Sequence, residues 1–176
     1  YMPSEETPID ISFAETFTNK GGHFLFCESS KLVPLNLEEI LKENQWKNEH
    51  VLSLNETIAE QFNLTLISET SGNLKAYQAA VMFCEYIISN TGKILLSEHQ
   101  IKHYSLPDLP KTIIIIAKTK QIVKDVSQGM SSLKNKYKKV IPTNITTLKS
   151  KSESSEEKVF SESETSAKNI YLLLED

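Results

Sequence analysis

The stretch from Ala79 to Val126 decides the fold of this chain. It reads AAVMFCEYIISNTGKILLS from Ala79 to Ser97 and, after a polar connector that ends at Pro110, TIIIIAKTKQIVKDV from Thr112 to Val126. An apolar strand, a Thr-Gly turn, a second apolar strand and a β-branched run are typical of a sheet that is buried on both faces. The stretch therefore predicts the centre of an α/β domain.

The segments on the N-terminal side of this stretch alternate between helical and extended patterns. Each strand-like segment is followed by a helix-like one, as expected for βαβ units with parallel strands and helices on both faces. The predicted elements are a helix over 9–20 ended by Gly21-Gly22, a strand at HFLFC (23–27), a short helix around Leu37–Leu41, a strand at HVLSL (50–54), a helix capped by Asn55 and running to Phe62, and a third apolar segment over Leu64–Ile67.

A helix is also predicted after Thr119, with a lysine-rich face. Seven lysines lie between Lys118 and Lys139, against one acidic residue, Asp125. This pattern fits either a solvated helix face, which is the simpler interpretation, or a surface for an acidic partner. The apolar face of this helix is predicted to hold Ile122, Val126, Met130, Leu133 and Tyr137.

The C-terminal part contains a segment of different composition. Residues 149–169 include seven serines and five glutamates, which is typical of a linker or flexible loop. The apolar IYLLLE that follows has to enter the core. We therefore expect a single domain over residues 1–176, with residues 149–169 as a loop before a final strand.

Composition excludes several classes of protein. The 176 residues suit one domain with one core, and no apolar run approaches the roughly 20 residues that cross a bilayer. A net charge of -4 argues against nucleic acid as the main partner, and the N-terminus does not resemble a signal peptide, so we expect a cytoplasmic protein. All 19 basic residues are lysine, so an anion site here would use lysine or backbone amides.

Few residues suggest chemistry by themselves. The two cysteines, Cys27 and Cys84, cannot supply the four thiolates of an iron-sulfur cluster, and Cys84 has no recognisable base. His99 and His103 have a zinc-like spacing but no HExxH pattern, so a loop is the simpler interpretation and no metal is expected. Glu85 either faces solvent at a sheet edge or, if buried, has a raised pKa.

The order of these features resembles the LUD, or lactate-utilisation, domain family. The residues that carry the resemblance are the Thr-Gly turn before an aliphatic strand, the Pro107-Asp108 step and the isoleucine-rich strand running into Gln-Ile-Val. The resemblance extends from about Phe13 to the C-terminus. It implies an α/β fold with a mostly parallel central sheet flanked by helices, of the NagB/RpiA/CoA-transferase-like type.

The resemblance also implies a candidate site. Asn90, Thr91, Gly92 and Lys93 match a turn that resembles a ligand-facing loop in this family, and Gln121 would line the same pocket. The family tends to carry glutamate where Asn90 stands, and an amide cannot act as a general base. The family's glycine-containing segment corresponds to the Ser/Glu-rich region here, whose glutamates would repel an anion. A purely structural role for the Thr-Gly turn is the other interpretation.

Three functions follow as hypotheses. The first is a divergent LUD-domain protein, an accessory or ligand-binding component in the oxidation of lactate to pyruvate, working with iron-sulfur partner proteins and carrying no cofactor itself. The second is an enzyme of the wider superfamily that acts on a phosphorylated or CoA-linked small molecule. The third is an interaction module that uses the lysine-rich helix. Whether the chain is an enzyme stays open at this stage, and an anionic small molecule is the expected ligand.

Overall fold

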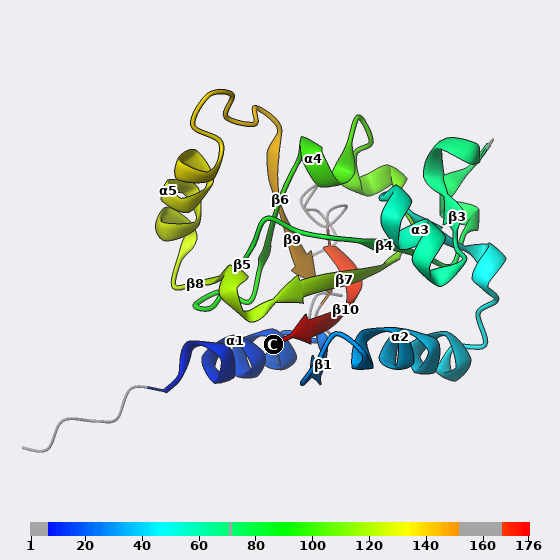
Figure 1. Ribbon diagram of the computed structural model, residues 1–176, viewed down its shortest axis with the longest axis horizontal. Helices are drawn as coiled ribbons and strands as arrows, with labels where there is room; N and C mark the ends of the chain where they lie inside the picture. Colours follow the sequence, from blue (N-terminus) through cyan, green and yellow to red (C-terminus); the bar gives the residue numbers. More distant parts are fainter. Residues whose placement is uncertain (1–6, 71, 152–166) are drawn as a thin grey trace, which may run out of the picture.

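The computed structural model describes residues 7–70, 72–151 and 167–176, and its elements follow the order shown in Figure 1. The strands are β1 (His23–Cys27), β2 (Val51–Ser53), β3 (Thr65–Leu66), β4 (Ala79–Met82), β5 (Tyr86–Ile88), β6 (Ile94–Ser97), β7 (Thr112–Lys118), β8 (Ile122–Val123), β9 (Ile145–Ser150) and β10 (Ala167–Glu175). The helices are α1 (Ile9–Asn19), α2 (Leu32–Glu43), α3 (Glu56–Phe62), α4 (Glu98–Ile101) and α5 (Val126–Lys136), with short 3-10 turns η1 (Asn48–His50), η2 (Ile67–Glu69), η3 (Leu74–Ala76), η4 (Leu106–Asp108) and η5 (Thr119–Gln121).

Ten strands of the described residues form one largely parallel sheet. Its main path runs β3-β2-β4-β7-β10-β9-β6-β5-β8, and β1 pairs with β10 beside β9. Among the strand pairs that the structure describes, only β5–β6 and β6–β9 are antiparallel. The predicted α/β class with a mostly parallel central sheet is confirmed.

The central strands β7 and β10 are buried on both faces, which explains their unbroken apolar sequence. Ile114 and Ile116 pack with residues of α2 and α3, while Ile113 and Ile115 point into the other core cluster. Each fully buried isoleucine contributes about 1.5–3 kcal/mol relative to an exposed one. Side chains of the Thr112–Ile116 run therefore enter two hydrophobic clusters, one on each face of β7.

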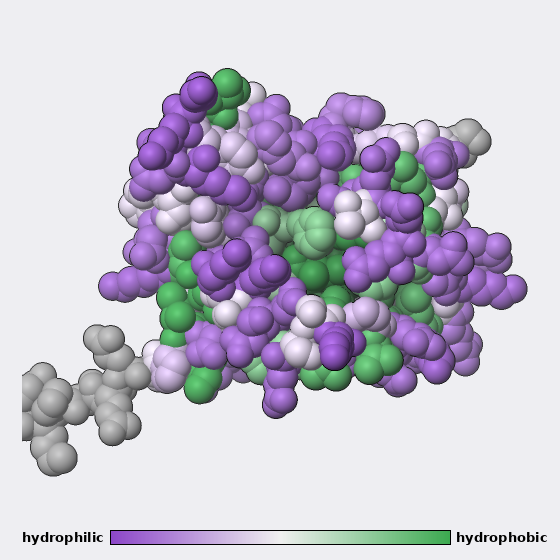
Figure 2. All heavy atoms as spheres, in the orientation of Figure 1, coloured by the Kyte–Doolittle hydropathy of each residue, from purple (hydrophilic) through white to green (hydrophobic). Residues whose placement is uncertain are grey.

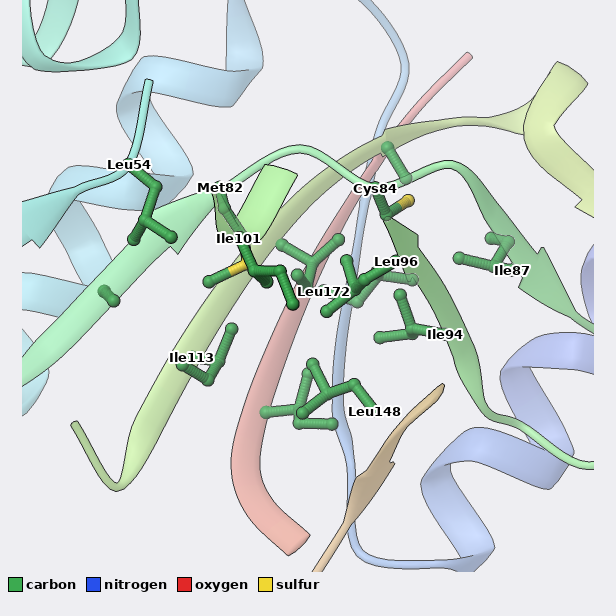
Figure 3. Close-up of a cluster of buried hydrophobic side chains, with 14 of the residues drawn as sticks. Leu54, Met82, Cys84, Ile87, Ile94, Leu96, Ile101, Ile113, Leu148 and Leu172 are labelled. Atoms are coloured by element: carbon green, nitrogen blue, oxygen red, sulfur yellow. The ribbon is translucent and has the colours of Figure 1, made fainter. Parts of the chain in front are cut away.

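The two faces of the parallel strands are covered differently. Helices α2 and α3 cover one face. The other face is covered by α1 and by a second β layer made of β5, β6, β8 and β9, which form the end of the same strand path. Figure 3 shows side chains of the two layers meeting, with Ile94, Leu96 and Leu148 opposite Ile113 and Leu172. Helix α5 then packs on the outer side of the second layer, where Met130 of α5 contacts the cluster that contains Leu95 of β6 and Val123 of β8.

Two predicted elements differ from the structure. The apolar run from Ala79 divides into β4 and β5, because the chain leaves the parallel strands at Phe83–Glu85 and enters the second layer. The helix predicted after Thr119 begins only at Val126, where the Asp125 side chain accepts a hydrogen bond from the Gln128 N–H and caps it. Ile122 lies in β8 instead, since Ile122 and Val123 pair with Ile87 and Ile88.

Several local predictions are confirmed. The Asn55 side chain accepts a hydrogen bond from the Ile58 N–H and caps α3, and the final strand forms as β10. Both ends of the predicted 149–169 loop belong to strands β9 and β10. Its central residues 152–166 lie outside the described residues.

The Thr-Gly turn between β5 and β6 is held against α1. Gly92 has φ +71°, and a Cβ atom placed on it would lie 3.1 Å from the backbone N and Cα of Phe17. Glycine is therefore required twice over, once by the backbone conformation and once by the close approach of α1.

We expect Gly92→Ala to lower the free energy of unfolding by about 2 kcal/mol or more, since it combines left-handed strain with a displacement of α1. Gly72→Ala is the matched control, because Gly72 has φ +100° but a Cβ atom placed on it would meet no atom of the described residues within 4 Å. It is expected to cost only the conformational part, about 1 kcal/mol. Urea unfolding followed by circular dichroism measures both, and equal losses would show that contact with α1 contributes nothing.

Candidate functional site

The Asn90–Lys93 turn lies at an accessible end of the second β layer. Asn90 is exposed and its N–H donates to the Lys124 carbonyl, while the Thr91 hydroxyl accepts a hydrogen bond from the Lys93 N–H at 3.3 Å. The register of β6 and β9 pairs Ile94 with Leu148. The turn therefore lies beside the C-terminal end of β9.

Gln121 lies away from this turn. Its amide nitrogen donates to the carbonyls of Cys84 and Glu85 at 2.8 and 3.1 Å, and its amide oxygen accepts from the Lys118 N–H at 2.7 Å. Because β5 and β8 run parallel, Gln121 precedes the pair at one end, whereas Asn90 follows it at the other. The structure thus brings Asn90, Thr91, Gly92 and Lys93 together and places Gln121 apart from them. The Gln121 side chain instead holds the connection between β4 and β5 through its hydrogen bonds to the Cys84 and Glu85 carbonyls.

The densest polar cluster of the described residues surrounds Glu85. Its carboxylate, which has no solvent exposure, accepts hydrogen bonds from Ser97 Oγ at 2.6 Å, Lys136 Nζ at 2.9 Å and the Tyr137 hydroxyl at 2.8 Å. Ser97 ends β6, while Lys136 and Tyr137 end α5. The cluster therefore ties the C-terminus of α5 to the second β layer.

The hydrogen bonds decide the charge state of Glu85. Burial alone raises the pKa of the carboxyl, but the donors from Ser97, Lys136 and Tyr137 outweigh it and lower the pKa below the ordinary 4.5. The pKa of Lys136 is raised, because its pairing with Glu85 exceeds the opposing effect of burial. Burial and the nearby Glu85 carboxylate together raise the pKa of Tyr137. Both sequence interpretations of Glu85 are wrong, since the residue is buried and yet holds its charge.

Neither cysteine is an accessible nucleophile. Burial and the neighbouring Glu85 carboxylate raise the pKa of the Cys84 thiol to about 12, and burial also raises the pKa of Cys27. A thiol with such a pKa carries almost no thiolate at neutral pH.

The two histidines with zinc-like spacing point to different neighbours. His99 lies in α4 and stacks on Tyr137 with ring centroids 4.7 Å apart, whereas His103 follows α4 and lies 4.1 Å from the ring of Tyr104. Residues 98–101 form a short helix where a loop was expected, because Ser97 and Gln100 make a capping box. Within the described ranges no group of three or more His, Cys, Asp or Glu side chains is placed to hold a metal ion.

Lys168 is a buried cation that sequence reasoning missed. The side chain is 5% exposed, and its ammonium donates to the Leu109 carbonyl at 3.0 Å. Burial, with Lys75 nearby, lowers its pKa to about 8 despite the opposing effect of Asp108. Its register partner is Ser150, whose buried hydroxyl has no hydrogen-bond partner among the described residues. The low apolar content of residues 149–169 hid this position, since the strand character of Ala167–Asn169 appears only once β10 is paired.

The comparisons with known proteins agree with this architecture. Residues 12–174 match the LUD domain, so the chain belongs to the LUD-domain family. Its structure is similar to a crystal structure of a DUF162 family protein from Deinococcus radiodurans, with a TM-score of 0.69, 16% sequence identity and 96% of each chain covered. At that identity the likeness concerns the fold. No curated protein matches the chain.

Membership of the family supports a role related to lactate utilisation in general terms. In the described part of the chain, no helix has the length and apolar character needed to span a membrane.

The Glu85 cluster generates a prediction about stability. We expect Glu85→Gln to lower the free energy of unfolding by about 2–3 kcal/mol at pH 7, because it removes a buried charge that three donors require. Since the folded-state pKa of Glu85 is lowered, this contribution is complete above pH 4.5 and is lost as the pH falls through the folded-state value. Denaturant unfolding between pH 3 and 7 measures it.

Glu38→Gln is the matched control for this experiment. Glu38 pairs with Lys42 at 3.4 Å on the exposed face of α2, so the substitution is expected to cost under about 0.5 kcal/mol. Equal effects of the two substitutions would contradict a structural role of the Glu85 cluster.

Removing the charge of Lys168 is expected to increase the free energy of unfolding, in contrast to removing the charge of Glu85. We expect Lys168→Met to raise the free energy of unfolding by about 1–2 kcal/mol at pH 7, because the folded chain holds an ammonium in a site that disfavours charge. Between about pH 8 and 10.5 the unfolded chain binds the proton that folded Lys168 gives up, so the wild type gains stability there and the difference closes.

Exposed Lys111→Met controls for the loss of one positive charge. A destabilised Lys168→Met variant with a pH profile parallel to that of the wild type would show instead that the ammonium is charged and paired in the folded protein.

Proposed function

We propose that this LUD-domain protein is an accessory or ligand-binding component of lactate utilisation, which binds a small carboxylate without turning it over. The observation that carries the proposal is the state of three candidate catalytic groups, of which Asn90 lies in the Thr-Gly turn while Glu85 and Cys84 lie at the opposite end of β5. Glu85 is engaged on both carboxylate oxygens, Cys84 has a pKa of about 12, and Asn90 does not titrate. None of these three described groups is therefore a free general base or nucleophile.

The ligand in this proposal contacts the exposed side of the Asn90–Lys93 turn. Lys93 provides the positive charge, and the side chains of Asn90 and Thr91 provide hydrogen-bonding groups for the hydroxyl and carboxylate oxygens of lactate. Gly92 shapes the turn. Gln121, which belongs to the same sequence-based prediction, does not contact the ligand in this proposal and instead holds the Cys84–Glu85 backbone at the other end of β5.

The oxidation itself needs an electron acceptor from elsewhere. Two buried cysteines cannot provide the four thiolates of a common iron-sulfur cluster, so the proposal assigns electron transfer to iron-sulfur partner proteins. Lactate loses two electrons and two protons on becoming pyruvate, and this chain would bind or position one of these molecules.

A second candidate is interaction with an acidic protein through α5. Lys134, Lys138 and Lys139 are exposed beside Val140 and Ile141, which are 79% and 41% exposed. Figure 2 shows hydrophilic side chains over α5 and a hydrophobic group at the tip of the loop that follows it. Lys136, by contrast, is paired with Glu85.

The test of the first candidate is a titration of the purified chain with L-lactate and pyruvate, followed by amide chemical shifts. We expect shifts at Thr91–Ile94, and an affinity at least about tenfold weaker in Lys93→Ala, because a charge-assisted hydrogen bond is lost. Lys31→Ala removes an exposed lysine at the start of α2 and is expected to bind as the wild type does.

Absence of any shift at the turn, or equal affinities of Lys93→Ala and wild type, would contradict carboxylate binding there. The function would then lie on a protein-binding surface such as that of α5.

A further inference from the structure

Two clefts border the same pair of parallel strands, β2 and β3, at opposite ends. The first, of about 460 Å³, lies at the carboxyl ends, between the segments that follow β2, β3 and α4. The second, of about 400 Å³, lies at the amino ends. Helix α3 and the chain after α4 both lie in the upper right part of Figure 1. Open α/β sheets usually bind their ligands outside the carboxyl ends of their parallel strands.

The side chains of the first cleft offer a cation, a ring pair and hydroxyls. Lys102 and His103 are exposed, and the His103 ring lies 4.1 Å from the half-buried ring of Tyr104. Thr57 and Ser68 also line the cleft, and Glu56 supplies the one carboxylate that the described residues contribute to its lining. Among the described residues, the side chains of Thr57, Ser68 and Lys102 have no hydrogen-bond partner, so they can meet a ligand.

The backbone at Lys102 is strained. Lys102 has φ +57° and ψ -133°, a conformation that L-residues rarely adopt. It is held by hydrogen bonds from the Lys102 N–H to the Glu98 carbonyl at 2.9 Å and from the Tyr104 N–H to the Ile101 carbonyl at 3.0 Å. Glycine would fill this position at a lower conformational cost, so a lysine here is a candidate functional residue.

The second cleft differs from the first in charge. It contains Lys47, but also the carboxylates of Glu49 and Glu69, and no aromatic side chain of the described residues lines it. The charged side chains that line the second cleft sum to a net negative charge, which would repel an anion. In the first cleft the positive charge of Lys102 balances the negative charge of Glu56. Lys47 is consequently a matched control for Lys102.

We propose that the first cleft binds a small ring-bearing phosphate ester of the nucleoside monophosphate class. The ring stacks against His103 and Tyr104, the phosphate meets Lys102, and the hydroxyls of Thr57 and Ser68 bond the polar groups between them. A volume of about 460 Å³ is within the usual range for a ligand of this size and far exceeds the needs of three-carbon lactate. This first cleft is separate from the Asn90–Lys93 turn, and the proposal is independent of the proposed lactate role.

The test is a titration with adenosine 5′-monophosphate, with adenosine and inorganic phosphate as component probes, followed by amide shifts and calorimetry. The wild type is expected to bind the monophosphate more tightly than either component, with shifts at residues 55–57, 66–68 and 102–104. Lys102→Ala is expected to weaken binding about tenfold or more, and Lys47→Ala to leave it unchanged. His103→Ala is expected to weaken binding of adenosine as well, because it removes half of the ring pair.

Lys102→Gly separates function from stability. It relieves the backbone strain, so its Tm is expected to rise by about 2–4 °C, while its affinity for the monophosphate falls as in Lys102→Ala. A wild type without shifts around the cleft, or affinities that do not differ between wild type and the two Lys102 variants, would overturn the proposal. Lactate shifts at Thr91–Ile94 are recorded separately, so each site succeeds or fails independently.

Discussion

The structure depends on the burial of β7 and β10 on both faces. A strand such as Thr112–Ile116, with isoleucine at four successive positions, cannot leave either face in water without exposing a large apolar surface. One face is closed by α2 and α3, and the other needs a second layer as broad as the first. That layer consists of the short strands β5, β6, β8 and β9 together with helix α1. The arrangement of the layers therefore follows from the need to bury both faces of β7 and β10.

The second layer has to be anchored in turn, and polar groups do part of this work. Glu85 lies where the chain passes from β4 into β5, and its carboxylate gathers donors from the end of β6 and the end of α5. Gln121 fixes the backbone at the same place. Buried charges are tolerated when their hydrogen-bonding capacity is met, and such a fully bonded cluster specifies one docking position for α5. The same hydrogen bonds hold the pKa of the Glu85 carboxyl below its ordinary value.

The two proposed ligand sites are separate from this anchor. The Thr-Gly turn projects from the second layer beside the end of β9, while the larger cleft lies at the carboxyl ends of β2 and β3. One offers a lysine and small polar groups on a tight turn, and the other offers a strained lysine beside two rings. The proposed small carboxylate and the proposed ring-bearing phosphate ester would therefore have different surroundings, and neither place contains a free thiolate or a free buried carboxylate among the described residues.

The sequence by itself determined the class of fold, because unbroken β-branched runs alternate with helical patterns and leave few other arrangements. It also determined the cap at Asn55, the turn at Gly92 and the final strand, since each depends on local chemistry. Only the tertiary structure decided that Ile122 joins a strand, that Gln121 lies away from Asn90, and that Glu85 stays charged in the interior. These outcomes depend on partners distant in sequence, such as Ile87 for Ile122 and Lys136 and Tyr137 for Glu85. Periodicity reports which side chains seek burial, whereas the pKa of a buried carboxyl depends on donors that arrive only when the chain has folded.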